Sequence, residues 1–122
     1  NLLTTAMNLK KLFNRSASSD NSTKATMELA KSEIASNDVV VFSKSYCPYC
    51  TYTKDTLNGM GINAKVIELN EIDSGDEMQG ALMVISGQRT VPNVFVKGQH
   101  LGGNDDTQAA AKNGKLQQML GN

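Results

Sequence analysis

The sequence predicts a single α/β domain with a parallel or mixed β-sheet. Helix-type and strand-type apolar patterns alternate over residues 22–120, in the order αβαβαββα. The run Val-Val-Val-Phe at 39–42 places four bulky apolar residues in a row, which is typical of a strand covered on both faces. A chain of 122 residues is long enough for one compact domain with its own core, and no internal repeat is present.

The first half of the domain follows from cap and breaker signals. Asn21, Ser22 or Thr23 can cap the first helix, and an Asn-Asp pair ends it before the first strand. Cys47 opens the second helix, which two nearby glycines end. The expected elements are a helix over 22–36, a strand over 39–43, a helix over 47–58 and a strand over 64–69.

The second half contains one helix, a β-hairpin and a terminal helix. The segment 97–99, Lys-Gly-Gln, is a turn signal between two short strands. Asp105 or Asp106 can cap the last helix, which breaks near Gly114 and resumes after it. The expected elements are a helix over 77–86, strands over 93–96 and 100–101, and a helix from about 105 to 120.

Composition argues against several classes of partner. The chain has 12 basic and 12 acidic residues, so its zero net charge favours neither a nucleic acid nor a membrane surface. No apolar run approaches the roughly 18 residues of a membrane span. Only His100 could join the two cysteines as a nitrogen or sulfur ligand, so we expect no zinc site within one chain.

Residues 1–21 differ in composition from the domain expected over 22–122. They are basic and rich in hydroxyl side chains, with no acidic residue before Asp20, as in organellar transit peptides. We expect a flexible extension, either a transit remnant or a dispensable cytosolic segment. The first alternative places the protein in a plastid or mitochondrion, and the second places it in the cytoplasm. The first residue is not Met, which indicates a processed, truncated or tagged chain.

The chemistry is expected at Cys47-Pro48-Tyr49-Cys50, which holds both cysteines of the chain. The thiolate is the nucleophilic form of cysteine, and the N-terminus of a helix stabilises a negative charge. Cys47 stands at that position, and Lys44 adds a nearby cation. Cys50 lies one helical turn further on and is expected to be more deeply buried. Cys47 is therefore predicted to attack and Cys50 to resolve.

Three separated motifs carry a family resemblance. They are KSYCPYC at 44–50, GQRTVPNVFV at 87–96 and GGNDD at 102–106. Together they resemble the glutaredoxins, specifically the dithiol class with a C-P-Y-C active site, over residues 22–120. The resemblance implies a thioredoxin fold, with a four-stranded mixed sheet flanked by helices. A thioredoxin would carry C-G-P-C preceded by Trp, and this chain has no Trp.

The resemblance also implies a binding site for glutathione. Lys44 and Gln88 occupy the family's positions for the glycine carboxylate, and Tyr49 contributes its hydroxyl group and ring face. The segment Thr90-Val91-Pro92 is expected beside Cys47, with Pro92 in the cis form. The backbone of Val91 would then pair with the cysteinyl residue of glutathione.

The γ-glutamyl end of glutathione is expected at the third motif. After the turn at Gly103, Asn104 and Asp105 would present backbone N–H groups to the carboxylate. Asp106 would accept a hydrogen bond from the α-ammonium group. Helix capping is an alternative role for Asp105 and Asp106, and the two roles are compatible.

The implied function is that of a glutathione-dependent thiol–disulfide oxidoreductase. Glutathione would be a co-substrate, no cofactor would be tightly bound, and the partners would be glutathionylated or disulfide-containing proteins acted on by a monomer. The alternative is a [2Fe–2S] cluster held between two chains by the first cysteine and glutathione. Pro48 argues against this alternative, because by family resemblance the cluster-binding dithiol glutaredoxins tend to carry Ser or Gly at that position.

Four further side chains and His100 are expected to have no chemical role. His100 is predicted to face solvent on an edge strand. The others are predicted to pack against the domain, and they are Tyr46, Met60, Met78 and Met83.

Overall fold

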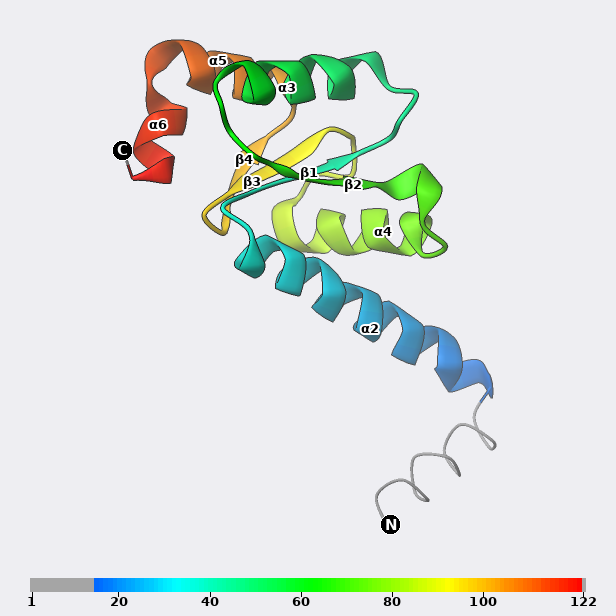
Figure 1. The fold of residues 1–122 in the computed structure, drawn as a ribbon. Helices are drawn as coiled ribbons and strands as arrows, with labels where there is room; N and C mark the ends of the chain where they lie inside the picture. The colour runs from blue at the N-terminus through cyan, green and yellow to red at the C-terminus, as the bar shows by residue number, and fades with distance from the viewer. Residues whose placement is uncertain (1–14, 122) are drawn as a thin grey trace.

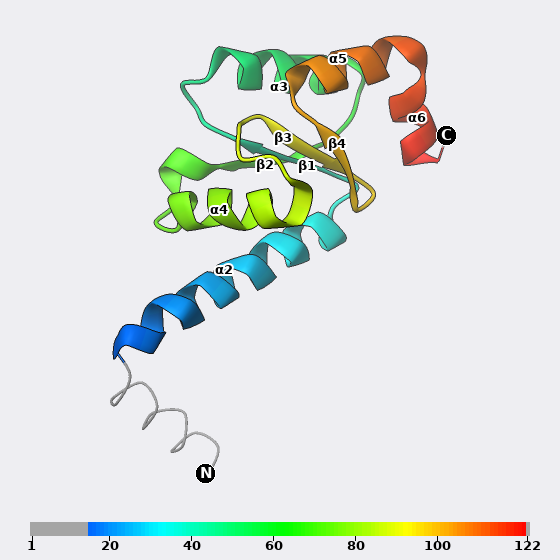
Figure 2. The same cartoon turned by 180° about the vertical axis from the view of Figure 1, so that it is seen from behind.

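A computed structural model describes the backbone of residues 15–121, and it shows a β-sheet between two helical layers (Figures 1 and 2). One layer holds α3 (Pro48–Gly59), α5 (Asn104–Asn113) and α6 (Lys115–Leu120). The other holds α2 (Arg15–Ser36) and α4 (Gly75–Ser86), which pack against each other. Among the helices described here, none has the length and apolar character needed to cross a membrane.

The sheet has four strands in the order β2-β1-β3-β4. They are β1 (Val39–Ser43), β2 (Lys65–Glu68), β3 (Asn93–Val96) and β4 (Gln99–Gly102). β1 pairs with β2 in parallel and with β3 antiparallel, and β3 and β4 form an antiparallel hairpin. The predicted four-stranded mixed sheet flanked by helices is confirmed.

The two central strands divide the core into two halves. Val39 and Val41 pack beneath α3, α5 and α6, whereas Val40 and Phe42 point to the opposite face, toward α2 and α4. This alternation follows from the two-residue period of a strand. On the second face Phe42 meets Phe95 of β3 edge to face, with ring centroids 5.9 Å apart. The prediction that the first strand is covered on both faces is confirmed.

The first helix begins earlier than expected. α2 starts at Arg15, not after a cap at residues 21–23. Residues 15–22 contain no Gly or Pro, and adding residues to an existing helix costs far less free energy than starting one. The predicted extension over 1–21 therefore overlaps α2 at 15–21, and its residues 1–14 lie outside the described part of the chain. Side chains are described from Thr23 onward, and Ala30 and Ile34 are buried on the inner face of the helix.

The helix expected over 77–86 also begins two residues early, at Gly75. Asp76 and Glu77 then fall in its first turn, where negative charge is favoured by the helix dipole. A short 3-10 helix, η1 (Leu69–Glu71), comes directly before and crowds this end of α4. Gly75 is buried so close to the Leu69 carbonyl that a Cβ atom would overlap the carbonyl oxygen. The early start thus depends on a residue without a side chain.

Gly75→Ala is predicted to lower the free energy of unfolding by about 2–3 kcal/mol, because the backbone must shift to admit the Cβ atom. Chemical denaturation followed by circular dichroism measures the loss. Gly80→Ala is the control in the same helix, since its Cβ would meet only the Arg89 side chain at 3.6 Å. That variant should gain about 0.5–1 kcal/mol. Equal shifts in both variants would contradict the steric account.

Candidate active site

Cys47 lies at the end of the loop between β1 and α3. It is the N-cap residue, with extended φ and ψ of −90° and 118°, and Pro48 occupies the first helical position. Its N–H group donates to the Lys44 carbonyl at 3.0 Å, and its sulfur accepts from the Cys50 N–H group at 3.4 Å. The half-buried sulfur therefore stands at the positive end of the helix dipole, which stabilises a thiolate. The predicted position of Cys47 is confirmed.

Cys50 has a different environment although it is only one turn away. Its side chain is 0% exposed, and both cysteines are free thiols. Burial raises the pKa of the Cys50 thiol, and its contact with Cys47 adds to the increase. Contacts with the Lys44 backbone and the Ser43 hydroxyl act in the opposite direction. The two thiols are thus unequal, as predicted, with Cys50 buried and held in its neutral form.

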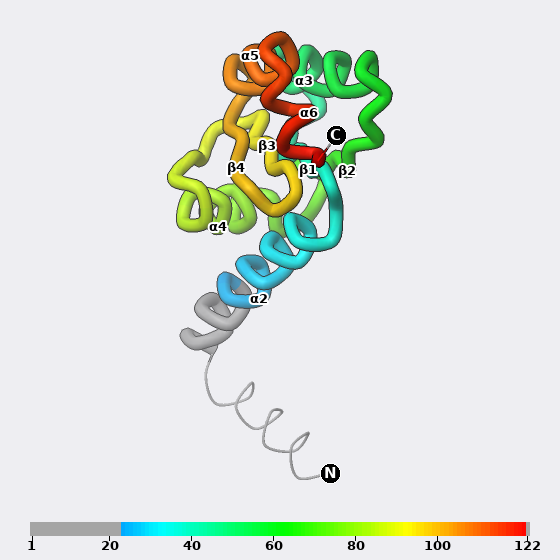
Figure 3. Tube along the Cα trace, turned by 90° about the vertical axis from the view of Figure 1, so that its left-hand side faces the viewer, coloured from blue at the N-terminus to red at the C-terminus, as the bar shows by residue number. Residues whose placement is uncertain are grey.

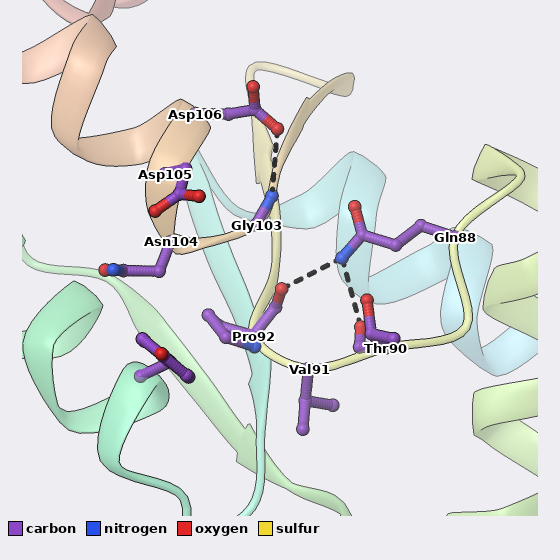
Figure 4. Close-up of a pocket in the computed structure, with 9 residues that line it drawn as sticks. Gln88, Thr90, Val91, Pro92, Gly103, Asn104, Asp105 and Asp106 are labelled. Carbon is purple, nitrogen blue, oxygen red and sulfur yellow. Dashed lines mark hydrogen bonds between the residues drawn. The ribbon is translucent and has the colours of Figure 1, made fainter.

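A cavity of about 490 Å³ lies between the first turn of α3, the segment before β3 and the turn before α5 (Figure 4). Nine of the ten residues that the family resemblance assigns to a substrate site line this cavity. Lys44 is the exception, since it lies on the loop before Cys47 and is not among the lining residues. The nine are Tyr49, Gln88, Thr90, Val91, Pro92, Gly103, Asn104, Asp105 and Asp106.

Gln88 braces the segment that forms one wall of the cavity. Its side-chain amide donates to the carbonyl of Thr90 at 3.0 Å and to that of Pro92 at 2.9 Å (Figure 4). The peptide bond between Val91 and Pro92 is cis, as expected. Both N–H donors of the amide are engaged by the main chain, so Gln88 shapes the wall in this arrangement. Its predicted role as a donor to a carboxylate stays a prediction.

The turn before α5 forms the opposite wall. Gly102 has a φ of +130°, and a Cβ atom there would collide with the Asp106 carboxylate. That carboxylate accepts a hydrogen bond from the Gly103 N–H group at 3.4 Å. The expected cap at Asp105 or Asp106 is wrong: Gly103 is the cap, and both acids lie in the first turn. The reason is that a third-position carboxylate reaches back to the cap, as in a capping box.

A polar clamp, which the sequence did not reveal, joins this turn to α3. The Asn104 side-chain oxygen accepts from the Thr53 hydroxyl at 3.0 Å and from the Gln108 amide at 3.1 Å. The Gln108 amide also donates to the Thr56 hydroxyl at 2.8 Å. The only signal in the sequence is spacing: the two threonines are three residues apart and the two amides four, so each pair shares a helix face.

A second hydrogen-bond network, centred on Asn93, holds Gln88 in place. Asn93 is 1% exposed, and its amide nitrogen donates to the Ser86 hydroxyl at 3.3 Å and to the Gln88 carbonyl at 3.2 Å. Its oxygen accepts from His100 Nε2 at 2.9 Å. Because the amide nitrogen is the donor in two bonds, the oxygen is the acceptor, and His100 must carry hydrogen on Nε2. Asn93 thereby links β3 and β4 to the end of α4.

His100 is exposed on the edge strand, as predicted, but its ring is not free in solvent. The imidazole leans against Phe95, with ring centroids 5.1 Å apart, and its Nε2 atom is held by Asn93. Burial lowers the pKa of His100, and the negative charge of Asp106 partly offsets this decrease. The ring is therefore neutral at physiological pH and has a supporting role.

The packing predicted for the other side chains is confirmed only in part. Met78 is buried in the core and Met60 packs against its edge. The prediction is wrong for Met83, which is 47% exposed, and for Tyr46, which is 66% exposed beside Cys47. Met83 lies on the exposed face of α4, and Tyr46 lies in the loop between β1 and α3.

The family of the chain follows from a direct comparison. The glutaredoxin family model matches residues 39–101, more than half of the chain, including both cysteines and the cis-proline segment. The chain belongs to the glutaredoxin family.

Individual glutaredoxins agree with this assignment. The glutaredoxin of Vernicia fordii is 50% identical over 91 residues, covering 75% of this chain and 88% of that protein. Glutaredoxin-C6 of Oryza sativa subsp. japonica is also 50% identical over 91 residues, covering 75% and 81%. A crystal structure of a buckwheat glutaredoxin–glutathione complex superposes with a TM-score of 0.78 at 42% identity, covering 81% of this chain and 90% of that one. The predicted thioredoxin fold is confirmed by these structural neighbours.

In this glutaredoxin, Asn93→Ala is predicted to lower the free energy of unfolding by about 2–3 kcal/mol. The change leaves Ser86, His100 and the Gln88 carbonyl without their buried partner. Urea denaturation at neutral pH is the measurement. Asn63→Ala is the control, because Asn63 is exposed between α3 and β2, and its effect should stay within about 0.5 kcal/mol. If the two variants are equally stable, the network does not brace the site.

Proposed function

We propose that this glutaredoxin reduces glutathione mixed disulfides and protein disulfides through Cys47, with glutathione as the electron donor. The observation that carries the proposal is the inequality of the two thiols. Cys47 is accessible at a helix N-terminus, and Cys50 is buried one turn behind it. A thiol at the N-terminus of a helix, with a buried thiol one turn behind it, is suited to attack followed by optional resolution. Membership of the family agrees, because glutaredoxins are glutathione-dependent thiol–disulfide oxidoreductases.

The proposed glutathione contacts use the two walls of the cavity. The backbone of Val91, in the segment before β3, lies at the cavity wall and is the proposed pairing partner of the cysteinyl residue. At the other wall, the first N–H groups of α5 have no partner within the helix and can bind the γ-glutamyl carboxylate. Asp106 is the proposed acceptor for the α-ammonium group, and Lys44 the proposed cation for the glycine carboxylate. The similar buckwheat protein was solved as a glutathione complex, which supports this assignment.

The monothiol route needs only Cys47. Its thiolate attacks the glutathione sulfur of a glutathionylated protein, and the sulfur–sulfur bond breaks as the protein thiolate leaves and takes a proton from water. The product is a disulfide between Cys47 and glutathione. A second glutathione thiolate then attacks the glutathione sulfur of that disulfide. Oxidised glutathione departs, and Cys47 returns as the thiolate.

The dithiol route adds Cys50. When Cys47 is joined to a substrate protein, the Cys50 thiol loses its proton and attacks the Cys47 sulfur, which releases the reduced protein and closes an internal disulfide. Two glutathione molecules then reduce this disulfide in sequence. All residues invoked belong to one chain, so a monomer is the proposed active unit. Neither the family match nor the relatives named above specifically support the [2Fe–2S] alternative.

Cys47→Ser is predicted to abolish glutathione-dependent turnover of a glutathionylated protein, because serine provides no thiolate to form the mixed disulfide. Cys50→Ser should retain monothiol deglutathionylation, because the first route does not use the second thiol. A coupled assay of oxidised glutathione production measures both variants beside the wild type. Full activity in Cys47→Ser would overturn the proposed function, and complete inactivity of Cys50→Ser would show that the dithiol route is obligatory.

Closure of the internal disulfide is predicted to accelerate with pH beyond about 8.5, the ordinary pKa of a thiol. Burial is the main cause of the raised pKa of Cys50, and we expect it to remain when Cys47 has been glutathionylated. At a given pH, Cys50 is therefore less often a thiolate than an ordinary cysteine would be. The rate of disulfide closure should rise about tenfold per pH unit below the raised pKa of Cys50. Rapid acid quenching and mass spectrometry follow the glutathione that is released. A rate that levels off below pH 8 would contradict the raised pKa.

A further inference from the structure

We propose that a second cavity, beside the proposed glutathione pocket, receives a lysine or arginine side chain of the polypeptide substrate. This glutaredoxin would then prefer glutathionylated cysteines that have basic residues next to them. The inference rests on the proposed function and adds a substrate preference to it. A mixed disulfide has two halves, and once the glutathionyl half fills the first pocket, the protein half must lie on an adjacent surface.

The second cavity, of about 400 Å³, lies along the groove between α3 and α5. It shares a wall with the first, because Asn104 lines both. It also continues the same aromatic surface: Tyr49 lines the first cavity and Tyr52 the second, and their rings meet edge to face with centroids 6.2 Å apart. A peptide leaving the first cavity over Tyr49 therefore reaches the second along the contacting rings of Tyr49 and Tyr52.

The aromatic surface is itself unusual in this chain. All three of its tyrosines fall within residues 46–52 around the two cysteines. Tyr46, Tyr49 and Tyr52 are 66%, 61% and 56% exposed, whereas Phe42 and Phe95 are buried in the core. Exposed aromatic side chains gathered at one place are typical of surfaces that bind another polypeptide.

The chemistry of the second cavity selects the charge of its occupant. Its lining includes Asp55 and no lysine or arginine. Asp55 is exposed, and among residues 23–121 it makes no ion pair, since the neighbouring Lys54 is bound to Glu68 at 3.2 Å. A carboxylate and an exposed tyrosine in one cavity lining can attract a cation, the first by its charge and the second by its ring quadrupole.

The hydrogen-bonding groups of the second cavity also favour a cation over an anion. The Gln108 amide nitrogen is already engaged by Thr56, Asn104 and, at 3.4 Å, the Tyr52 carbonyl. Its donors are therefore unavailable to an anion. The nitrogen of the Asn104 amide donates to no group in the described part of the chain, and it suits a main-chain carbonyl of the same peptide. The groups that line the second cavity therefore suit a lysine or arginine side chain of a bound peptide.

The test uses two glutathionylated peptides that differ only in the residues flanking the cysteine, lysine in one and glutamate in the other. We expect the wild type to prefer the lysine peptide by about tenfold in kcat/KM, the size expected of one exposed charge pair and one cation–π contact together. Asp55→Asn should reduce this preference at least threefold, and so should Tyr52→Leu. The preference should also fall as the salt concentration rises.

Asp73→Asn is the matched control, because it removes the same charge from an exposed position before α4. It should leave the preference unchanged. An absent preference in the wild type, or equal preferences in Asp55→Asn and Asp73→Asn, would overturn the inference.

Two further measurements separate the inference from the proposed function. The mixed disulfide of glutathione and 2-mercaptoethanol has no charged second half, so failure of the wild type to reduce it would overturn the proposed function alone. Binding of an unreactive lysine peptide, with serine in place of cysteine, is followed by NMR shifts at Asp55 and Gln108. Shifts there that are absent with the glutamate peptide support the inference even without turnover, and their absence with both peptides overturns it.

Discussion

The antiparallel pairing of β1 with β3 is the interaction on which the site depends. Its register sets Phe42 opposite Asn93, so the last residues of β1 meet the first residues of β3. The chain then continues from β1 to Cys47 and arrives at β3 from Pro92, which brings two segments over 40 residues apart to one end of the sheet (Figure 3). A slip of one residue would move every core side chain of β3 to the opposite half of the core, where it would not fit, so the packing that forms the core also fixes the site.

Burial distinguishes two chemically identical thiols. Cys47 caps α3 and is half-buried, whereas Cys50, one turn further along the same helix, is fully buried. The polar contacts around them follow the same division. Groups at the cavity walls, such as the first N–H groups of α5 and the amide nitrogen of Asn104, retain donors that are unpaired among the described residues. The buried amide of Asn93, in contrast, has partners for both its nitrogen and its oxygen.

The sequence predicted those parts of the structure that depend on local patterns. Consecutive valines identified β1, and glycines marked the end of α3. The family motifs identified nine residues of the cavity, although they lie on three separate segments. The contacts between α3 and α5 could not be predicted, because Thr53 and Asn104 are 51 residues apart and neither side chain is unusual on its helix. The early starts of α2 and α4 were missed because helix ends depend on neighbouring elements, as at Gly75.

Cys47 caps α3, and its sulfur is also the atom that gains and loses electrons. This double role links the stability of α3 to the redox potential of the Cys47–Cys50 disulfide. A thiolate is a charged acceptor for the Cys50 N–H group and for the helix dipole, whereas a disulfide sulfur is uncharged. If the helix stabilises the thiolate, the thiolate must stabilise the helix by the same free energy. The reduced form then has the stronger α3, and whatever stabilises this end of α3 more in the thiolate form than in the disulfide form makes the disulfide a better oxidant.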